Sequence, residues 1–418
     1  MKRTGFIIVT VFIALILTLT RQQYNISASE NHREEDTVYT QPIPEPLDIA
    51  EIITGYDSLL SAEILNTGTV GAAVAIVYKN QIAFLKCFGV KKAGTNDSID
   101  QHTLFRLASV SKSITGVLAG MLASENIVSL DGKVTEYLPG FRLKTREATE
   151  SITVRDLLRH TTGLTAHAYD DLVEQKIPLA QIMESLPLAN IVSSPGQLYA
   201  YQNVMFSLYD TIVAAKTGKN YSDMLNEKIF GPFSMNDAST GFSAFKDNNN
   251  KALPHTGSDK YFRVTSLNDR YYNTLPAAGV NASISDMANF LLALLNDSLG
   301  SWNKNVEEMI FTPQIESILT RSYFRQWDPM ESKEYGIGWR LVGYKGRKVA
   351  YHGGFVKGYR AEVALCKEEN AGIVFLCNSP CSIAAKAVPM FLNPLFELKD
   401  NQKLANDPHK TANPPNKS

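Results

Sequence analysis

The 418-residue sequence has little cysteine and no excess of charge of either sign. Four cysteines are too few for a disulfide scaffold, and 26 glycines and 18 prolines without an internal repeat exclude a collagen-like chain. Lys and Arg number 41 against 42 Asp and Glu, so a net charge of -1 offers no broad positive field for nucleic acid phosphates. The 44% of hydrophobic residues can build a buried core, which indicates an ordinary globular protein that does not bind nucleic acid.

The sequence also lacks the common signatures of a metal site. Its seven histidines are scattered, and it has neither an H-E-x-x-H run nor paired C-x-x-C motifs. Cys87, Cys366, Cys377 and Cys381 lie in apolar contexts, where a buried free thiol is more usual than a disulfide. We therefore expect no metal ion, no cofactor and four free cysteines.

The two ends of the chain differ in composition from its body. Residues 4–20 are apolar and uncharged, but this run is shorter than the ~20 residues that a spanning helix needs. With small residues at 27–29, this predicts that residues 1–29 are a cleaved signal peptide, with a membrane anchor through residues 4–20 as the alternative. Residues 30–46 are acidic and proline-rich and predict a flexible linker, and polar residues 399–418 predict a disordered tail.

The body, residues 47–398, is then expected to lie in the periplasm or another space outside the cytoplasm. Two apolar runs within residues 70–89 predict a β-hairpin, and three more strand-like runs lie within residues 348–378. Between them, residues 114–122 carry apolar side chains at the spacing of one helix face, and capping-box patterns begin at Thr153 and Ser283.

This order of elements predicts an α/β fold of the α+β type. One antiparallel sheet would be built from the N- and C-terminal strands and flanked by helices, with a mainly helical lobe inserted between them.

Ser109 and Lys112 form an S-x-x-K motif at the start of that amphipathic helix. Three residues apart, they share one helix face, so the lysine nitrogen can reach the serine hydroxyl. A lysine whose pKa is lowered by burial and positive neighbours can take the hydroxyl proton, and a helix N-terminus is such a neighbour. The backbone N–H of Ser109 can also stabilise the oxyanion formed when the hydroxyl attacks a carbonyl. The turn therefore predicts a nucleophile and its base.

The same four-residue pattern occurs at Ser243 and at Ser301, which limits its specificity. Ser243 runs into an Asp- and Asn-rich stretch of loop composition, and Ser301 follows a polar stretch. Only Ser109 has a strand-like approach, through Leu104 to Leu107, and opens an apolar helix. Context therefore favours Ser109 over a serine that merely caps a helix or faces solvent.

A second candidate element is Tyr201 with Asn203, a Y-x-N motif that follows Pro195 and Gly196. A phenol near a lysine can lose its proton more easily and relay it, and an Asn amide can bind a substrate carbonyl or hold the lysine. Y-x-N also occurs at Tyr78 and Tyr271, but neither follows a Pro-Gly turn.

A third candidate element is His352-Gly353-Gly354, at the end of a strand-like run. Two glycines let a substrate lie against the strand edge, and the N–H of Phe355 could complete an oxyanion hole. A structural histidine in a tight turn is the alternative for this element.

In this order, the three elements resemble those of the serine β-lactamase and penicillin-binding protein superfamily. The surrounding segments resemble the class C β-lactamase-related group, which includes D-Ala-D-Ala carboxypeptidases, D-aminopeptidases and esterases. The similar segments are residues 105–115, 157–164, 195–196, 276–279, 335–339 and 352–354, and the resemblance covers roughly residues 49–396.

The resemblance implies a role for each site residue. Ser109 would form an acyl-enzyme while Lys112 and Tyr201 shuttle the proton. Asn203 would orient the substrate carbonyl, and the amides of Ser109 and Phe355 would hold the oxyanion. His160 lies in a segment typical of the group and is expected to be structural.

One departure concerns substrate. His352-Gly353-Gly354 stands where many class C β-lactamases have K-T-G, so a permanent cation and a hydroxyl that would hold a β-lactam carboxylate are absent. Arg360 is the candidate replacement for that cation.

The predicted function is that of an exported serine hydrolase that acts through a Ser109 acyl-enzyme on a small-molecule or peptide substrate. The substrate class is an amide or ester, either a β-lactam or a D-amino-acid peptide. An esterase or D-Ala-D-Ala carboxypeptidase of the same fold is the alternative. An alternative of another class is a non-catalytic protein that binds cell-wall peptide.

Overall fold

A computed structural model of the chain describes residues 48–258, 260–296, 302–318, 324–327 and 329–405. The predicted signal peptide or anchor and the linker lie outside these described residues, as does the predicted tail beyond residue 405. Among the helices described, none is both long and apolar enough to cross a bilayer.

An eight-stranded antiparallel sheet joins the two ends of the body. Its order is β2-β1-β13-β12-β11-β10-β9-β8. From one edge to the other, the strands are β2 (Gln81–Gly89), β1 (Gly71–Tyr78), β13 (Ala371–Cys377), β12 (Tyr359–Cys366), β11 (Arg347–Val356), β10 (Arg340–Tyr344), β9 (Met330–Tyr335) and β8 (Ile315–Glu316). The predicted hairpin, the three C-terminal strands and the predicted fold class are confirmed.

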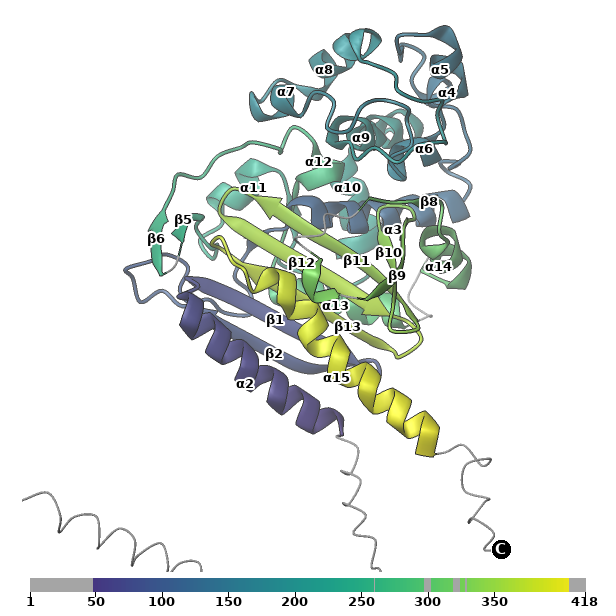
Figure 1. Cartoon of the computed structure of the whole chain (residues 1–418). Coiled ribbons are helices and arrows are strands. Elements are labelled where there is room, and N and C mark those ends of the chain that lie inside the picture. Colours follow the sequence, from purple (N-terminus) through teal and green to yellow (C-terminus); the bar gives the residue numbers. More distant parts are fainter. Residues whose placement is uncertain (1–47, 259, 297–301, 319–323, 328, 406–418) are drawn as a thin grey trace, which may run out of the picture. The chain divides into compact units, whose positions relative to one another are not determined.

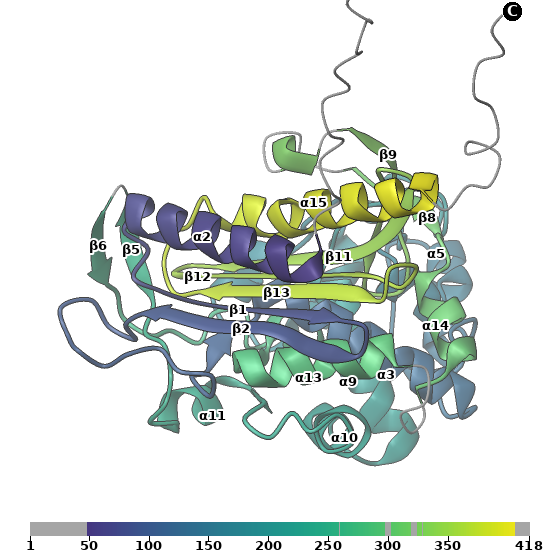
Figure 2. The same ribbon diagram turned by 90° about the horizontal axis from the view of Figure 1, so that it is seen from below.

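Helices cover both faces of this sheet. Figure 2 shows α2 (Ile49–Thr67) and α15 (Ala384–Ala405) on one face, with α3 (Ser111–Ser124) and α13 (Ile284–Leu295) on the other. Successive side chains of β1 point to opposite faces, so Ala73, Ala75 and Val77 join the core under α3 while Ala72, Val74 and Ile76 join the core under α15. Every residue of β1 is therefore buried.

A mainly helical lobe is inserted between the two groups of sheet strands, as the sequence predicts, and it occupies the upper part of Figure 1. It contains α4 (Val134–Tyr137), α5 (Arg146–Ser151), α6 (Val154–Leu158), α7 (Asp170–Glu174), α8 (Leu179–Ser185), α9 (Asn203–Thr217) and α10 (Tyr221–Leu225). The capping boxes predicted at Thr153 and Ser283 are both present, at the starts of α6 and α13.

Shorter elements complete the described chain. A three-stranded sheet combines β3 (Phe105–Arg106), β7 (Val280–Ala282) and β4 (Ser239–Thr240), and β5 (His255–Ser258) pairs with β6 (Tyr261–Val264). The remaining helices and turns are η1 (Ala108–Val110), η2 (Leu186–Leu188), η3 (Asn226–Phe230), α11 (Phe242–Asp247), α12 (Leu275–Ala278), α14 (Lys304–Phe311) and η4 (Arg325–Trp327).

The predicted start of the tail at residue 399 is wrong, because α15 continues to Ala405. Leu398 is buried, and two residues later Asp400 forms a 2.6 Å ion pair with the buried guanidinium of Arg347. Residues 399–405 have no apolar periodicity in the sequence, so composition alone predicts disorder there. An ion pair from a distant strand supplies the contact that composition does not reveal.

The four cysteines are free thiols, as predicted. Cys366 and Cys377 are buried, but Cys87 and Cys381 are partly exposed, so the prediction of burial is wrong for two of the four.

Candidate active site

Ser109 lies on the turn η1, between β3 and the start of α3. Ala108, the residue before it, has φ 47°, in the left-handed region that residues with a Cβ seldom adopt. Both neighbours of Ser109 are buried, whereas Ser109 itself is partly exposed. The turn is thus anchored by buried residues on both sides and leaves Ser109 accessible. Backbone strain such as that at Ala108 is common at functional sites.

Lys112 is fully buried one turn further on. Its Nζ lies 2.7 Å from Oδ1 of Asn203 and 3.0 Å from the carbonyl oxygen of Ala277. Burial lowers the pKa of Lys112 well below its usual value, the nearby Asp170 opposes this, and Arg340 lowers it further. A neutral amine would donate its two N–H groups to the two carbonyls and keep its lone pair for a proton. Lys112 therefore has the properties of a base.

Tyr201 connects the inserted lobe to the nucleophile turn. Its hydroxyl donates a 2.9 Å hydrogen bond to Oγ of Ser109, and its ring centroid lies 4.6 Å from Nζ of Lys112. Burial raises the pKa of Tyr201, although the contact with Ser109 and the charge of Arg340 partly oppose this. The raised pKa does not support the prediction that this phenol loses its proton easily, and Tyr201 is instead a hydrogen-bond donor to Ser109.

Asn203 holds the lysine, which was one of its two predicted uses. Its side-chain oxygen accepts from Lys112, and its Nδ2 donates 2.9 Å to Oδ2 of Asp170, at the start of α7. Asn203 is 7% exposed, and both the oxygen and the nitrogen of its side-chain amide have partners inside the protein. The other prediction, that Asn203 contacts the substrate carbonyl, is thus not supported. Asp170 carries no motif and was missed.

His352 is buried and has both ring nitrogens occupied. Nδ1 lies 3.0 Å from the carbonyl oxygen of Gly353, which can only accept, so Nδ1 carries the proton. Nε2 then accepts from the hydroxyl of Tyr335 at 3.2 Å. Burial lowers the pKa of His352 well below its usual value, and Arg340 and Lys112 add to the effect. The prediction that the His352 side chain contacts substrate is corrected: it is a neutral support for Tyr335.

The glycines after His352 let β11 lie against the nucleophile turn. A Cβ on Gly354 would come within 2.2 Å of the carbonyl oxygen of Leu107, which is shorter than any real contact. The pairing of β11 with β10 ends at Tyr351, so in the described chain Gly353, Gly354 and Phe355 pair only with β12. An extended substrate could use the other edge of this segment, and the Phe355 amide as oxyanion donor stays a prediction.

Arg340, at the start of β10, is a cation of the site that the sequence did not reveal. Its guanidinium carbon lies 5.6 Å from the centroid of the Tyr201 ring, and one of its nitrogens donates to the Tyr199 hydroxyl at 3.4 Å. Within the described part of the chain, Arg340 has no carboxylate partner. Arg360, the cation that the sequence suggested, instead contacts Glu362 and the ring of Phe355.

The buried ring of His160 packs against the ring of Tyr201. The two ring centroids lie 4.4 Å apart, and Nδ1 of His160 accepts from the backbone N–H of Gln202. Burial lowers the pKa of His160 well below its usual value, with Lys112 and Arg340 contributing. The expected structural role agrees with this packing.

The other described S-x-x-K serine is separate from this cluster. Ser243 is exposed on the short helix α11, and the Asn-rich stretch after that helix is a loop, as its composition predicts. Ser301 lies outside the described residues. Ser243 has no hydrogen bond to a tyrosine of the site, and among the described S-x-x-K serines only Ser109 accepts one.

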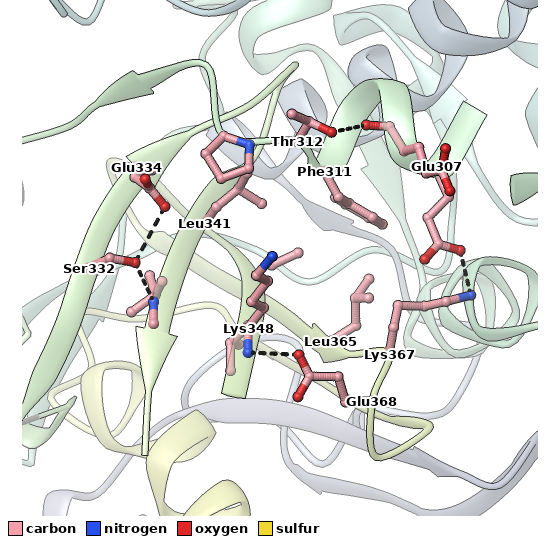
Figure 3. A pocket seen from close by; sticks show the side chains of 16 residues that line it. Glu307, Phe311, Thr312, Ser332, Glu334, Leu341, Lys348, Leu365, Lys367 and Glu368 are labelled. Carbon is pink, nitrogen blue, oxygen red and sulfur yellow. Dashed lines mark hydrogen bonds and ion pairs between the residues drawn. The ribbon is translucent and has the colours of Figure 1, made fainter. Parts of the chain in front are cut away.

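A pocket of about 320 Å³ lies apart from these residues, between α14 and strands β9 to β12 (Figure 3). Its apolar part includes Leu341 and Leu365, and an ion pair of 2.9 Å joins Lys367 and Glu307 at its side. It contains none of the predicted site residues, so we place the candidate active site at Ser109 and not in this pocket.

The sheet with its inserted helical lobe and the Ser109 turn place this chain in a known class. Residues 50–387 match the family model described as Beta-lactamase, and the chain therefore belongs to the Beta-lactamase family.

The individual relatives are distant. The protein flp of Staphylococcus aureus strain MRSA252 is 22% identical over 343 residues, which cover 79% of this chain and 64% of flp. The Beta-lactamase of Yersinia enterocolitica is 22% identical over 361 residues, covering 78% of this chain and 87% of that protein. The octameric penicillin-binding protein homologue from Pyrococcus abyssi has a TM-score of 0.68 and 20% identity, over 82% of this chain and 77% of that one. The chain thus spans less than two thirds of the length of flp.

Proposed function

We propose that this protein is a serine hydrolase that cleaves esters or amides through an acyl-enzyme on Ser109. The observation that carries the proposal is the 2.9 Å hydrogen bond from Tyr201 to Ser109, beside a buried lysine whose pKa is lowered. The nucleophile Ser109, the base Lys112 and the proton donor Tyr201 thus come from η1, from α3 and from the segment before α9, and they lie around one turn. A protein that only bound its ligand would gain nothing from this combination.

In the first step, the neutral amine of Lys112 takes the proton of Ser109 as Oγ attacks the substrate carbonyl carbon. The carbonyl oxygen becomes an oxyanion, which the backbone N–H groups of Ser109 and Phe355 stabilise. Asn203 and the carbonyl of Ala277 hold the lysine nitrogen in position throughout.

In the second step, the bond to the leaving group breaks, and the protonated phenol of Tyr201 gives the leaving oxygen or nitrogen its proton. The proton on Lys112 then returns to Tyr201. Water next attacks the acyl carbon and releases Ser109 by the same transfers in reverse order. Two titrating groups with pKa values shifted in opposite directions suit this sequence of transfers.

For the substrate, we propose an ester or amide that carries a carboxylate near the scissile bond. A guanidinium without a carboxylate partner favours an anion, and Arg340, a partly exposed residue beside Tyr201, has no such partner in the described part of the chain. β-Lactams and D-amino-acid peptides have this chemistry, and relatives carry the names Beta-lactamase and penicillin-binding protein homologue. We further propose that the protein acts outside the cytoplasm, because residues 4–20 have the composition of an export signal.

The test compares the wild type with Ser109→Ala and, as a matched control, Ser243→Ala. Each is assayed with a nitrophenyl ester, a chromogenic β-lactam and a D-Ala-D-Ala peptide. We expect Ser109→Ala to lose about a thousandfold or more of every activity that the wild type shows, and Ser243→Ala to lose none. Cleavage of the ester alone would identify an esterase. Undiminished activity in Ser109→Ala, or peptide binding without any turnover, would contradict the proposal.

A further inference from the structure

Two cysteines at the end of β13 lie close together, on the sheet face opposite to the catalytic helix. Cys377 is the last residue of β13 and belongs to the core beneath α15, and Cys381 precedes the start of α15. The Cys377 thiol lies between two acceptors, the carbonyl oxygen of Ser379, to which it donates at 3.4 Å, and the neighbouring Cys381 sulfur. The hydroxyl of Thr69 lies 3.6 Å from the Cys381 sulfur.

The surroundings of Cys381 favour its thiolate form. The hydrogen bond from Cys377 lowers the pKa of Cys381 to about 7; burial opposes this, and Thr69 and the backbone N–H groups of Ala384 and Ile383 support it. Burial raises the pKa of Cys87 to about 11 and that of Cys366 to about 12. Of these three free cysteines, only Cys381 has a lowered pKa.

Cys381 also lines an open pocket of about 480 Å³ that is basic. Arg325, Arg360 and Lys386 line it, and none of its described lining residues is acidic. Glu362 pairs with Arg360, and Glu63 with Lys386, so these carboxylates offset part of the positive charge. A ligand that reaches the Cys381 sulfur through this pocket passes at least three cationic side chains.

We propose that Cys377 and Cys381 form a reactive dithiol that exchanges with low-molecular-weight disulfides carrying carboxylates and closes into an intramolecular disulfide. The pair of adjacent thiols supplies an attacking and a resolving sulfur, and the basic pocket favours an anionic disulfide over a neutral one. The inference does not depend on the hydrolase activity, since none of these residues belongs to the catalytic cluster.

The exchange proceeds in two balanced steps. The Cys381 sulfur attacks one sulfur of the small disulfide, whose S–S bond breaks, and the departing thiolate takes up the proton that Cys381 lost. The Cys377 sulfur then attacks Sγ of Cys381, the mixed S–S bond breaks, and the second small thiol leaves with the proton of Cys377. Overall, two cysteine thiols are oxidised to one disulfide and the small disulfide is reduced to two thiols.

The experiment uses the reduced full chain with oxidised glutathione as the probe, followed by alkylation of the remaining thiols and mass spectrometry. We expect the wild type to lose two hydrogens and to give a linked Cys377–Cys381 peptide. Cys377→Ser should instead accumulate one glutathione on Cys381, because the resolving sulfur is gone. Cys381→Ser should give neither product, and a Cys87→Ser/Cys366→Ser variant should behave like the wild type.

A second arm tests the pocket. Lys386→Gln should slow the reaction with oxidised glutathione severalfold, and leave that with neutral 2-hydroxyethyl disulfide unchanged. The proposal is overturned if glutathione appears equally on Cys87, if Cys377→Ser gains no adduct, or if the wild type keeps four alkylatable thiols. Unchanged thermal unfolding of each variant confirms that these outcomes report on chemistry and not on misfolding.

Discussion

The Lys112 nitrogen lies 2.7 Å from the side-chain oxygen of Asn203, whose amide nitrogen in turn donates to Asp170. This chain of contacts places a neutral amide between the lysine and the carboxylate. Among the described residues, Lys112 is therefore held by hydrogen bonds and has no direct ion pair. A carboxylate in direct contact would keep the lysine protonated. Burial can then lower the pKa of Lys112, as a base at neutral pH requires.

The pH dependence of hydrolysis follows from this arrangement. Only the neutral form of Lys112 accepts a proton, so kcat/KM should rise with pH through the lowered pKa of Lys112 and then level off. The raised pKa of Tyr201 keeps the phenol protonated over the same range. Asn203→Asp places a negative charge beside Lys112 and should shift the rising limb to higher pH, by about one unit or more.

Asp170→Asn provides the opposite shift as a matched control. Because the charge of Asp170 raises the pKa of Lys112, its removal should move the rising limb to lower pH. The measurement is kcat/KM of ester hydrolysis over the stable pH range. If the rising limb of the pH profile moves in the same direction in Asn203→Asp and in Asp170→Asn, a group other than Lys112 controls the rate.

Arg340 should act on substrates according to their charge. Arg340→Gln removes the cation beside Tyr201, and we expect kcat/KM for a carboxylate-bearing ester to fall by about ten- to a hundredfold, the value of a charge-assisted hydrogen bond. A neutral ester of similar size should be affected much less. Arg360→Gln, at the cation suggested by sequence, serves as the comparison. An equal loss on both esters in Arg340→Gln would contradict a role in carboxylate binding.

Gly354 should be required for the contact between β11 and the nucleophile turn. In Gly354→Ala the new Cβ would meet the Leu107 carbonyl oxygen at 2.2 Å, so the strand or the turn must move. We expect a loss of about 1–3 kcal/mol in the free energy of unfolding, measured with urea, and a lower kcat. Gly140→Ala meets no atom within 4 Å and should change neither. Unaltered stability in Gly354→Ala would indicate that the two elements are not tightly packed.

The C-terminal helix offers a test of the corrected tail boundary. A chain ending at residue 405 keeps Asp400, whereas a chain ending at residue 398 leaves Arg347 with Glu369 but without Asp400. We expect the free energy of unfolding of the chain ending at residue 398 to be about 1 kcal/mol lower than that of the chain ending at residue 405. The difference is small because Asp400 is half exposed and its ion pair is partly screened. Thermal unfolding of both truncations distinguishes this from a tail that contributes nothing.

The sequence predicts the parts of the fold that follow from local periodicity. Alternating apolar runs indicate the strands around residues 70–89 and 348–378, and capping boxes locate the starts of α6 and α13, because both signals depend on neighbouring residues alone. The ordered motifs identify Ser109, Lys112 and Tyr201 as candidates, because a motif also depends only on residues that are close in the sequence.

The partners of those residues could not be predicted in this way. Asp170 and Arg340 reach the site from the start of a helix and the start of a strand, and no local pattern distinguishes them from surface residues. The substrate-binding uses predicted for Asn203 and His352 do not agree with the structure. Each depends on what the second polar atom of the side chain contacts, which is Asp170 for Asn203 and Gly353 for His352. Burial, which sets the pKa of Tyr201, is likewise a property of the folded chain.

The central claim is that Ser109 is the acylated nucleophile. The most direct measurement mixes the wild type with an activated ester, quenches the reaction in acid within its first turnover, and locates the acyl group by peptide mass spectrometry. We predict a single acyl group on the peptide that contains Ser109, and none in Ser109→Ala. An acyl group on another serine, or one that forms as fast in Ser109→Ala, would contradict the mechanism.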